Sequence, residues 1–150
     1  MMTATENALA LLVGEWQGEE TIATTRWGEG GPARGHFSAR LDLAGRVLLM
    51  DYREEREGNP ALQVHAVFSA GTEPGEYALH WFDSYGFVPT QPAPGHWDGA
   101  RLVFLRSSSR GQTRHSYAFR DDACELTLES SFDGGVHWEP VMQGSYRRVA

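Results

Sequence analysis

The sequence has no lysine, only one cysteine and no long hydrophobic run. Cys124 therefore cannot form an internal disulfide, and it fits no repeated spacing of metal ligands, so we expect a buried, unreactive thiol and no metal site. The apolar stretch at residues 8–13 is too short to span a membrane, and it lacks the flanking features of a signal peptide. We expect a cytoplasmic protein without membrane insertion.

Positive charge is also scarce. Thirteen arginines stand against twenty acidic residues, which gives a net charge of −7, and the arginines are scattered along the chain. Proteins that bind nucleic acids gather positive charge on one surface, so we expect no nucleic-acid partner.

Common enzyme signatures are missing too. The chain has no Gly-x-Ser-x-Gly elbow, no phosphate loop and no dinucleotide fingerprint, and nothing in it indicates a cofactor. His80, Asp83 and Ser84 are the residue types of a nucleophilic triad. They lie within five positions on one strand and its turn, where they cannot relay hydrogen bonds to one another. The sequence therefore favours a binding or structural protein over an enzyme.

Apolar and polar residues alternate with a period of two after Gly14, which is typical of strands with one buried face. Short turns separate most of these runs, and no helix long enough for a parallel crossover intervenes. The pattern predicts an all-β fold, an antiparallel up-and-down barrel of about ten strands, because an open sheet of that size would expose its edges. The predicted strands are residues 15–25, 34–43, 46–55, 62–69, 76–82, 96–97, 101–107, 113–120, 125–132 and 138–148.

A short N-terminal helix is expected in front of the first strand. Thr3 or Thr5 can cap it, Glu6 suits its first turn, and Gly14 can end it. At 150 residues the chain is expected to form a single domain, 1–150. The apolar stripe of the helix consists of Leu9, Leu12 and Val13.

The alternation also predicts which side chains point into the barrel. In residues 77–82 both faces are bulky, so either His80 or Trp81 could face inward. The predicted outer wall includes Ser38, Arg40, Asp42, Arg114, Ser116, Glu125, Thr127 and Glu129. The predicted inner wall consists of Phe37, Ala39, Leu41, Leu48, Met50, Tyr52, Val64, Ala66, Phe68, Leu102, Phe104, His115, Tyr117, Phe119, Leu126, Leu128, Phe132, Met142 and Tyr146.

Two motifs mark the ends of the predicted barrel. Residues 14–18 read Gly-Glu-Trp-Gln-Gly, a Gly-x-Trp-x-Gly pattern, and the last strand ends Tyr-Arg-Arg at 146–148. A Gly-x-Trp at the junction of a helix and a first strand resembles the opening motif of the lipocalins and their calycin relatives. The resemblance implies that Trp16 plugs the closed end of a barrel, with Arg147 or Arg148 over its ring in a cation–π contact.

Further segments narrow the resemblance. His-Trp-Phe-Asp-Ser at 80–84, Gly-His-Trp-Asp-Gly at 95–99 and Glu-Ser-Ser-Phe-Asp-Gly-Gly-Val-His-Trp at 129–138 are together similar to a group of uncharacterised bacterial lipocalin-like proteins. The similarity covers about residues 9–148 and implies the fold, without a catalytic residue. Ser131, Asp133, Gly135 and Trp138 also match the Asp-box of sialidase-type propellers. A propeller would repeat that box in each blade, so we interpret Asp133 and Trp138 as structural residues of a hairpin.

Histidine is spread over the chain, without the helical pair spacing of a metal site. Haem-binding barrels of the nitrobindin type share the Gly-x-Trp-x-Gly start, but their iron ligand is a histidine near the C-terminus. The last strand here has none, which makes haem binding a less favoured hypothesis. The six histidines are His36, His65, His80, His96, His115 and His137.

These observations favour a barrel that binds a small, largely apolar ligand. Buried polar tips need partners, and a ligand or water in a cavity supplies them. We expect the opening opposite Trp16, near the proline-rich residues 84–95, which form either a surface loop or a lid, and we expect uptake of an apolar dye. The alternative is a structural barrel or homodimer whose own aromatic side chains fill the interior. The predicted ligand-binding residues are Phe37, Met50, Tyr52, Trp81, Phe104, His115 and Tyr117.

Overall fold

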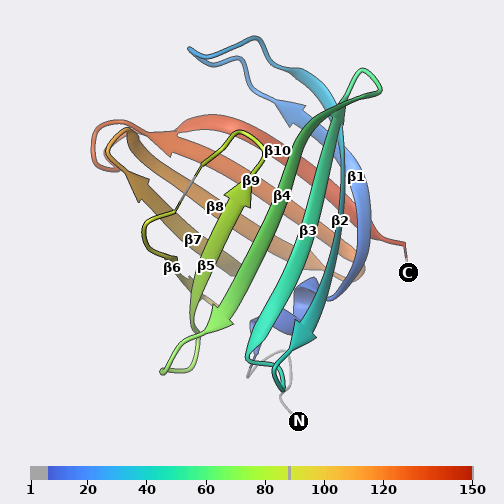
Figure 1. Ribbon diagram of the computed structural model, residues 1–150, viewed down its shortest axis with the longest axis vertical. Coiled ribbons are helices and arrows are strands. Elements are labelled where there is room, and N and C mark those ends of the chain that lie inside the picture. Colours follow the sequence, from blue (N-terminus) through green and yellow to red (C-terminus); the bar gives the residue numbers. More distant parts are fainter. Residues whose placement is uncertain (1–6, 88, 150) are drawn as a thin grey trace.

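The computed structural model describes residues 7–87 and 89–149. Within this part of the chain each strand pairs antiparallel with its sequence neighbours, and β1 also pairs with β10, which closes the barrel (Figure 1). The predicted all-β barrel is confirmed, and the predicted strands differ from the observed ones mainly at their ends. The strands are β1 (Gly14–Ile22), β2 (Gly31–Asp42), β3 (Val47–Arg56), β4 (Asn59–Ala70), β5 (Glu76–Asp83), β6 (Ala93–Trp97), β7 (Arg101–Ser108), β8 (Gly111–Arg120), β9 (Ala123–Ser131) and β10 (Glu139–Arg148).

The interior follows the two-residue alternation of the sequence. Phe37 pairs with Tyr52 across β2 and β3, and both side chains are buried, as the alternation predicts. In β5 the ambiguity resolves in favour of Trp81, which is buried, whereas His80 is only half-buried. The other large side chains that fill the barrel include Leu48, Phe68, Leu79, Leu102, Phe104, Tyr117 and Tyr146.

Two side chains depart from the predicted faces. Phe132 was expected inside, but it follows the end of β9, is 38% exposed and packs against Trp27 with ring centroids 5.4 Å apart. The alternation stops with the strand, so it no longer applies there. Ser116 was expected on a solvated wall, yet it is only 9% exposed, at a position where β8 lies between Val103 of β7 and Thr127 of β9. Leu41, Phe119 and Leu128 are half-buried.

The N-terminal helix is η1, a 3₁₀ helix over Ala8–Leu12 at one end of the barrel (Figure 1). Asn7 caps it, since its side chain accepts the Leu9 N–H at 3.1 Å. The expected caps Thr3 and Thr5, together with Glu6, lie outside the described residues. The helix closes this end, because Leu9 and Leu12 are fully buried and the Ala8 N–H donates to the Tyr77 hydroxyl at 2.9 Å.

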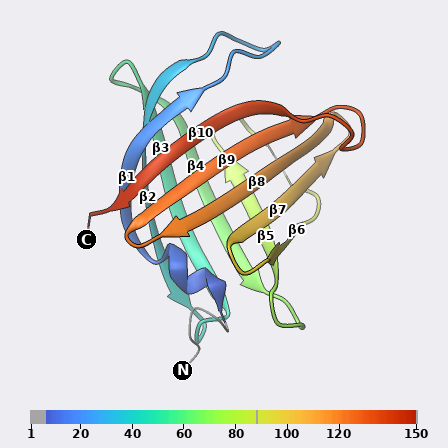
Figure 2. The same ribbon diagram turned by 180° about the vertical axis from the view of Figure 1, so that it is seen from behind.

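At the opposite end of the barrel, the residues that the structure describes include no such helix. Figure 2 shows the β1–β2 hairpin projecting beyond the barrel at this end. β6 is short and pairs with β5 only over Glu76–Leu79, so the upper halves of β5 and β7 are not bridged by it. Residues 84–87 and 89–92 lie across this part of the wall (Figure 1). In the described chain, no helix is long and apolar enough to cross a membrane.

Candidate functional site

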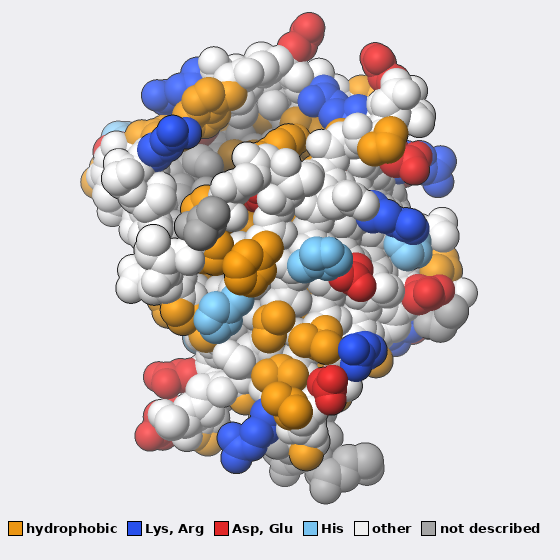
Figure 3. Space-filling view, viewed as in Figure 1, with side chains coloured by type: hydrophobic (Ala, Val, Ile, Leu, Met, Phe, Trp, Pro, Cys, Tyr) orange, Lys and Arg blue, Asp and Glu red, His pale blue; other side chains and the backbone are white. Residues whose placement is uncertain are grey.

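A cavity of about 140 Å³ lies inside the barrel toward its open end. Side chains from eight strands line it, together with Tyr85 from the loop after β5. Most of the lining is aliphatic or aromatic, and Tyr52, Glu54 and Tyr117 contribute polar groups. In Figure 3 the upper part of the visible face is hollowed, with apolar side chains along the hollow. The open end thus gives access to a mainly apolar space.

Five of the seven predicted ligand-binding residues line this cavity, namely Phe37, Met50, Tyr52, Trp81 and Tyr117. The other two are fully buried but do not contribute to the lining. Phe104 packs edge-to-face on Phe68, with ring centroids 5.3 Å apart, and His115 packs on Trp81 at 4.8 Å. These two side chains support the wall instead of forming its inner surface.

A polar cluster lies beside the cavity and was not predicted. Glu20 of β1 accepts hydrogen bonds through Oε2 from the hydroxyl groups of Tyr52 and Tyr146. The Tyr52 hydroxyl also lies 3.1 Å from Glu54 Oε2. Glu20 is 2% exposed and Glu54 6% exposed, and neither carboxyl group forms an ion pair with a described residue. Two acidic side chains are therefore buried together without a cation.

Two glycines provide the space for this cluster. A Cβ at Gly35 would lie 2.2 Å from Glu20 Oε2, and a Cβ at Gly144 would lie 2.3 Å from the Tyr146 hydroxyl. Gly144 stands opposite Glu20 in the β1–β10 pairing. A larger residue at either position would displace the groups that meet around the Glu20 carboxyl.

Burial is the main reason that the pKa of Glu20 is raised, to about 7, and the neighbouring Glu54 carboxyl group raises it further. The hydrogen bonds from Tyr146 and Tyr52 oppose this increase. Burial also raises the pKa of both tyrosines, so that they remain hydrogen-bond donors. The Glu20 carboxyl group is thus about half protonated near neutral pH. Glu20 Oε1 is buried and has no hydrogen-bond partner among the described residues.

The two-residue alternation of the sequence could have identified Glu20 and Glu54 as inward-facing residues. Glu20 lies an even number of positions from Trp16 in β1, and Glu54 lies an even number of positions from Tyr52 in β3, so each shares a strand face with a buried aromatic residue. Both glutamates therefore fall on the inner face. An acidic residue at an inward position is costly to bury and indicates a functional site more strongly than the aromatic residues beside it.

A second polar group lies behind Trp81. Arg106 Nε donates to His115 Nε2 at 2.9 Å, and the guanidinium carbon lies 5.1 Å from the Trp81 ring centroid and 5.0 Å from that of Phe87. Burial, with a contribution from Arg106, holds the pKa of His115 well below its ordinary value. His115 is therefore neutral. Because Nε2 accepts a hydrogen bond, its proton is on Nδ1, which is buried and has no partner in the described structure.

The loop after β5 is fixed to the barrel by Asp83. Its carboxylate accepts the Trp81 indole N–H at 3.0 Å and the backbone N–H groups of Tyr85 and Phe87 at 3.0 and 3.3 Å. Between this loop and β7 lies a second, outer space of about 470 Å³, lined by Phe87, Arg106 and serines 107–109 among others. Trp81 borders both spaces.

At the closed end, Trp16 is fully buried and lies under the Arg148 guanidinium, 4.5 Å from the ring centroid. Arg147 is exposed and makes no such contact in the structure. Gly14 begins β1 with φ of 129°, a conformation that favours glycine. The Gly-x-Trp motif and the last strand thus meet at the base of the barrel.

The Asp-box segment forms the turn between β9 and β10. The Asp133 carboxylate accepts the Ser131 hydroxyl at 2.8 Å and the His137 N–H at 2.9 Å, and the Ser131 hydroxyl accepts the Gly135 N–H at 2.8 Å. The backbone bond from His137 is the largest cause of a lowered pKa at Asp133. Trp138 packs under the Arg114 guanidinium carbon at 4.1 Å. The polar side chains of Ser131 and Asp133 are thus both used within the turn.

Over residues 7–87 and 89–149, no three His, Cys, Asp or Glu side chains come together in a group that could hold a metal ion.

A closed ten-stranded antiparallel barrel with a short helix across one end is a lipocalin-like fold. The chain is similar to Rv2717c from M. tuberculosis, with a TM-score of 0.76 and 13% sequence identity over 100% of both chains. It is also similar to the S-type phycobiliprotein lyase CPES from Guillardia theta, with a TM-score of 0.69 and 10% identity over 95% of this chain and 91% of the other. No family model and no curated protein matches the sequence. At these identities the likeness concerns the fold.

Proposed function

We propose that this barrel binds one small, largely apolar molecule in its interior cavity. The cavity itself is the observation that carries the proposal. Protein interiors are close-packed and contain few voids larger than a water molecule, so a space of about 140 Å³ is unusual for a purely structural barrel. The alternative of a filled interior is favoured less for the same reason.

The size of the cavity limits the ligand. Pockets for drug-sized molecules have volumes of about 300–1,000 Å³, whereas an apolar cavity of about 150 Å³ in another protein accommodates benzene. The space here is therefore suited to a molecule of about one ring. Five of the predicted residues, Phe37, Met50, Tyr52, Trp81 and Tyr117, would contact it.

Titration with benzyl alcohol tests the proposal, because this probe combines one apolar ring with one hydrogen-bonding group. We expect saturable binding by calorimetry with a dissociation constant of about 0.01–1 mM, as its few heavy atoms allow. Leu62 is half-buried at the cavity mouth, whereas Gln63, the next residue of β4, is exposed.

Leu62→Trp should fill the mouth and abolish binding, whereas Gln63→Trp adds the same side chain outside and should leave it unchanged. Both variants must first show unchanged β-rich circular dichroism spectra. Absence of saturable binding to the unmodified protein, or equal effects of the two variants, would contradict the proposal.

A further inference from the structure

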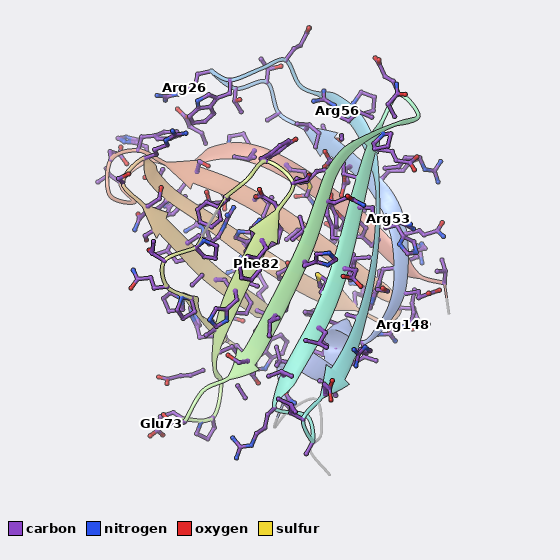
Figure 4. All side chains as sticks on the ribbon, in the orientation of Figure 1. Arg26, Arg53, Arg56, Glu73, Phe82 and Arg148 are labelled. Carbon is purple, nitrogen blue, oxygen red and sulfur yellow. The ribbon has the colours of Figure 1, made fainter. Side chains whose placement is uncertain are left out.

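Among the described residues that line the cavity, one side chain is acidic and none is basic. Glu54 is the charged side chain in the lining, and the aromatic side chains of Tyr52, Trp81 and Tyr85 line the same space. Arg56, two positions along β3, lies at the open end in Figure 4. Its guanidinium donates to the Glu29 carbonyl at 3.1 Å, and it forms no ion pair with Glu54.

The second carboxyl group, that of Glu20, also lacks a cationic partner among the described residues. It contacts Tyr52, which lines the cavity, and its Oε1 is buried without a hydrogen-bond partner in the described residues. Burial of a carboxylate without a cation is costly, so the uncompensated pair is an arrangement that a bound cation would stabilise.

We propose that the ligand of this cavity is a protonated amine with an apolar part of about one ring. Its ammonium group donates to Glu54, with Glu20 behind it, and its apolar part lies against the aromatic side chains. The inference rests on the proposed function and specifies the chemical class of the ligand.

Three properties of the molecule support an ammonium group over a neutral one. A carboxylate forms stronger hydrogen bonds with a charged donor than with a neutral one. Aromatic faces attract a cation within about 6 Å of the ring centre, and the cavity presents several of them. The net charge of −7 also favours the approach of a cation over that of an anion.

The carboxyl pair makes amine binding dependent on pH. The groups that face Glu20 are Glu54 and Tyr52 from β3 and Tyr146 from β10, and the pKa of Glu20 is about 7. Loss of its proton above this pH makes the pair more negative. An alkyl amine keeps its own proton there, since its pKa is close to that of lysine, about 10. Amine affinity should therefore rise as the pH increases through 7.

Benzylamine and benzyl alcohol provide the test, because they differ mainly in the charged group. At about pH 8 we expect benzylamine to bind at least about tenfold more tightly, and this preference should shrink severalfold at about pH 6. Glu54→Gln should remove the preference and leave benzyl alcohol affinity within about threefold. Glu55→Gln, the matched exposed neighbour on β3, should preserve it. Glu20→Gln should remove the pH dependence, which provides a second test if Glu54→Gln does not fold.

The outcomes separate the two proposals. Equal affinity for the two probes at about pH 8, a preference that survives Glu54→Gln, or an unchanged pH dependence in Glu20→Gln would overturn the amine assignment while leaving the binding function intact. Binding of neither probe would overturn the binding function itself.

Discussion

Arg148 and Trp16, which stand opposite each other on the last and first strands, stack at the base of the barrel with the guanidinium carbon 4.5 Å from the ring centroid. The guanidinium also donates to the Leu11 carbonyl at 3.2 Å, and the Trp16 indole donates to the Leu12 carbonyl at 2.9 Å. These contacts join β1, β10 and the N-terminal helix. The pair therefore holds the closed end of the barrel together.

Substitution of Trp16 should destabilise the fold more than substitution of Arg148. Trp16→Ala should destabilise the fold by about 3–5 kcal/mol, the usual cost for a buried large aromatic side chain. Arg148→Ala should cost about 1 kcal/mol, because a cation–π contact and a hydrogen bond at a partly exposed site are lost. Arg147→Ala provides the control and should change the free energy of unfolding by less than about 0.5 kcal/mol. Urea denaturation measures all three. Equal effects of the two arginine variants would show that the stack does not stabilise the base.

The β9–β10 turn depends on one buried hydroxyl. Ser131 is almost fully buried and bonds to both Asp133 and the Gly135 N–H. Ser131→Ala should cost about 1–2 kcal/mol in denaturation experiments, since it leaves a backbone donor without its partner. Ser130→Ala, on the opposite face of β9, should have little effect. A neutral Ser131→Ala variant would show that the Asp-box pattern does not stabilise this hairpin.

The Glu20 carboxyl should make the fold less stable as the pH rises. Its pKa is about 7 in the fold against 4.5 without the fold, so the native state binds the proton more tightly. The resulting stabilisation is fully present below about pH 4.5 and is lost as the pH passes 7, with a maximum effect of about 3 kcal/mol. Glu20→Gln should therefore gain stability relative to the unmodified protein between about pH 5 and pH 8, as measured by urea denaturation. The exposed neighbour Glu19→Gln should show no such gain, and a constant difference between Glu20→Gln and the unmodified protein would refute this account.

The Cys124 thiol should be inert in the folded protein. It is fully buried, and burial is the main cause that raises its pKa to about 12. Since the thiolate is the reactive form, a thiol-specific reagent should react at least about a hundredfold more slowly with the native protein than with the urea-unfolded chain. Comparable rates would indicate that this part of the barrel opens readily.

The sequence predicted the barrel because one rule, the two-residue alternation, applies to every strand. Five of the residues predicted to bind a ligand lie in the lining of the cavity, and their contact with a ligand stays a prediction. The rule becomes ambiguous where both faces are bulky, as for His80 and Trp81, and it ends where a strand ends, as for Phe132. The residue at which a strand stops pairing depends on the three-dimensional structure, so the sequence pattern did not predict that β9 ends before Phe132.

The acidic cluster of Glu20 and Glu54 shows a different limit of prediction from the sequence. The alternation alone places Glu20 and Glu54 inside, yet their meeting requires β1, β3 and β10 to be brought around the barrel to a common point. The contact between Arg106 and His115 likewise depends on the offset between β7 and β8. Such contacts depend on register and barrel closure, which composition and spacing do not determine.

Binding inside the barrel can be tested most directly at the tryptophan indole groups, each of which gives a separate ¹⁵N–¹H signal. Trp81 lines the cavity and donates its indole N–H to Asp83, whereas Trp27 is 66% exposed on the projecting hairpin and Trp138 lies on the outside. Addition of benzylamine should shift the Trp81 signal in a saturable manner and leave those of Trp27 and Trp138 unchanged. An unmoved Trp81 signal at saturating probe, or shifts centred on Trp27, would contradict the interior binding site.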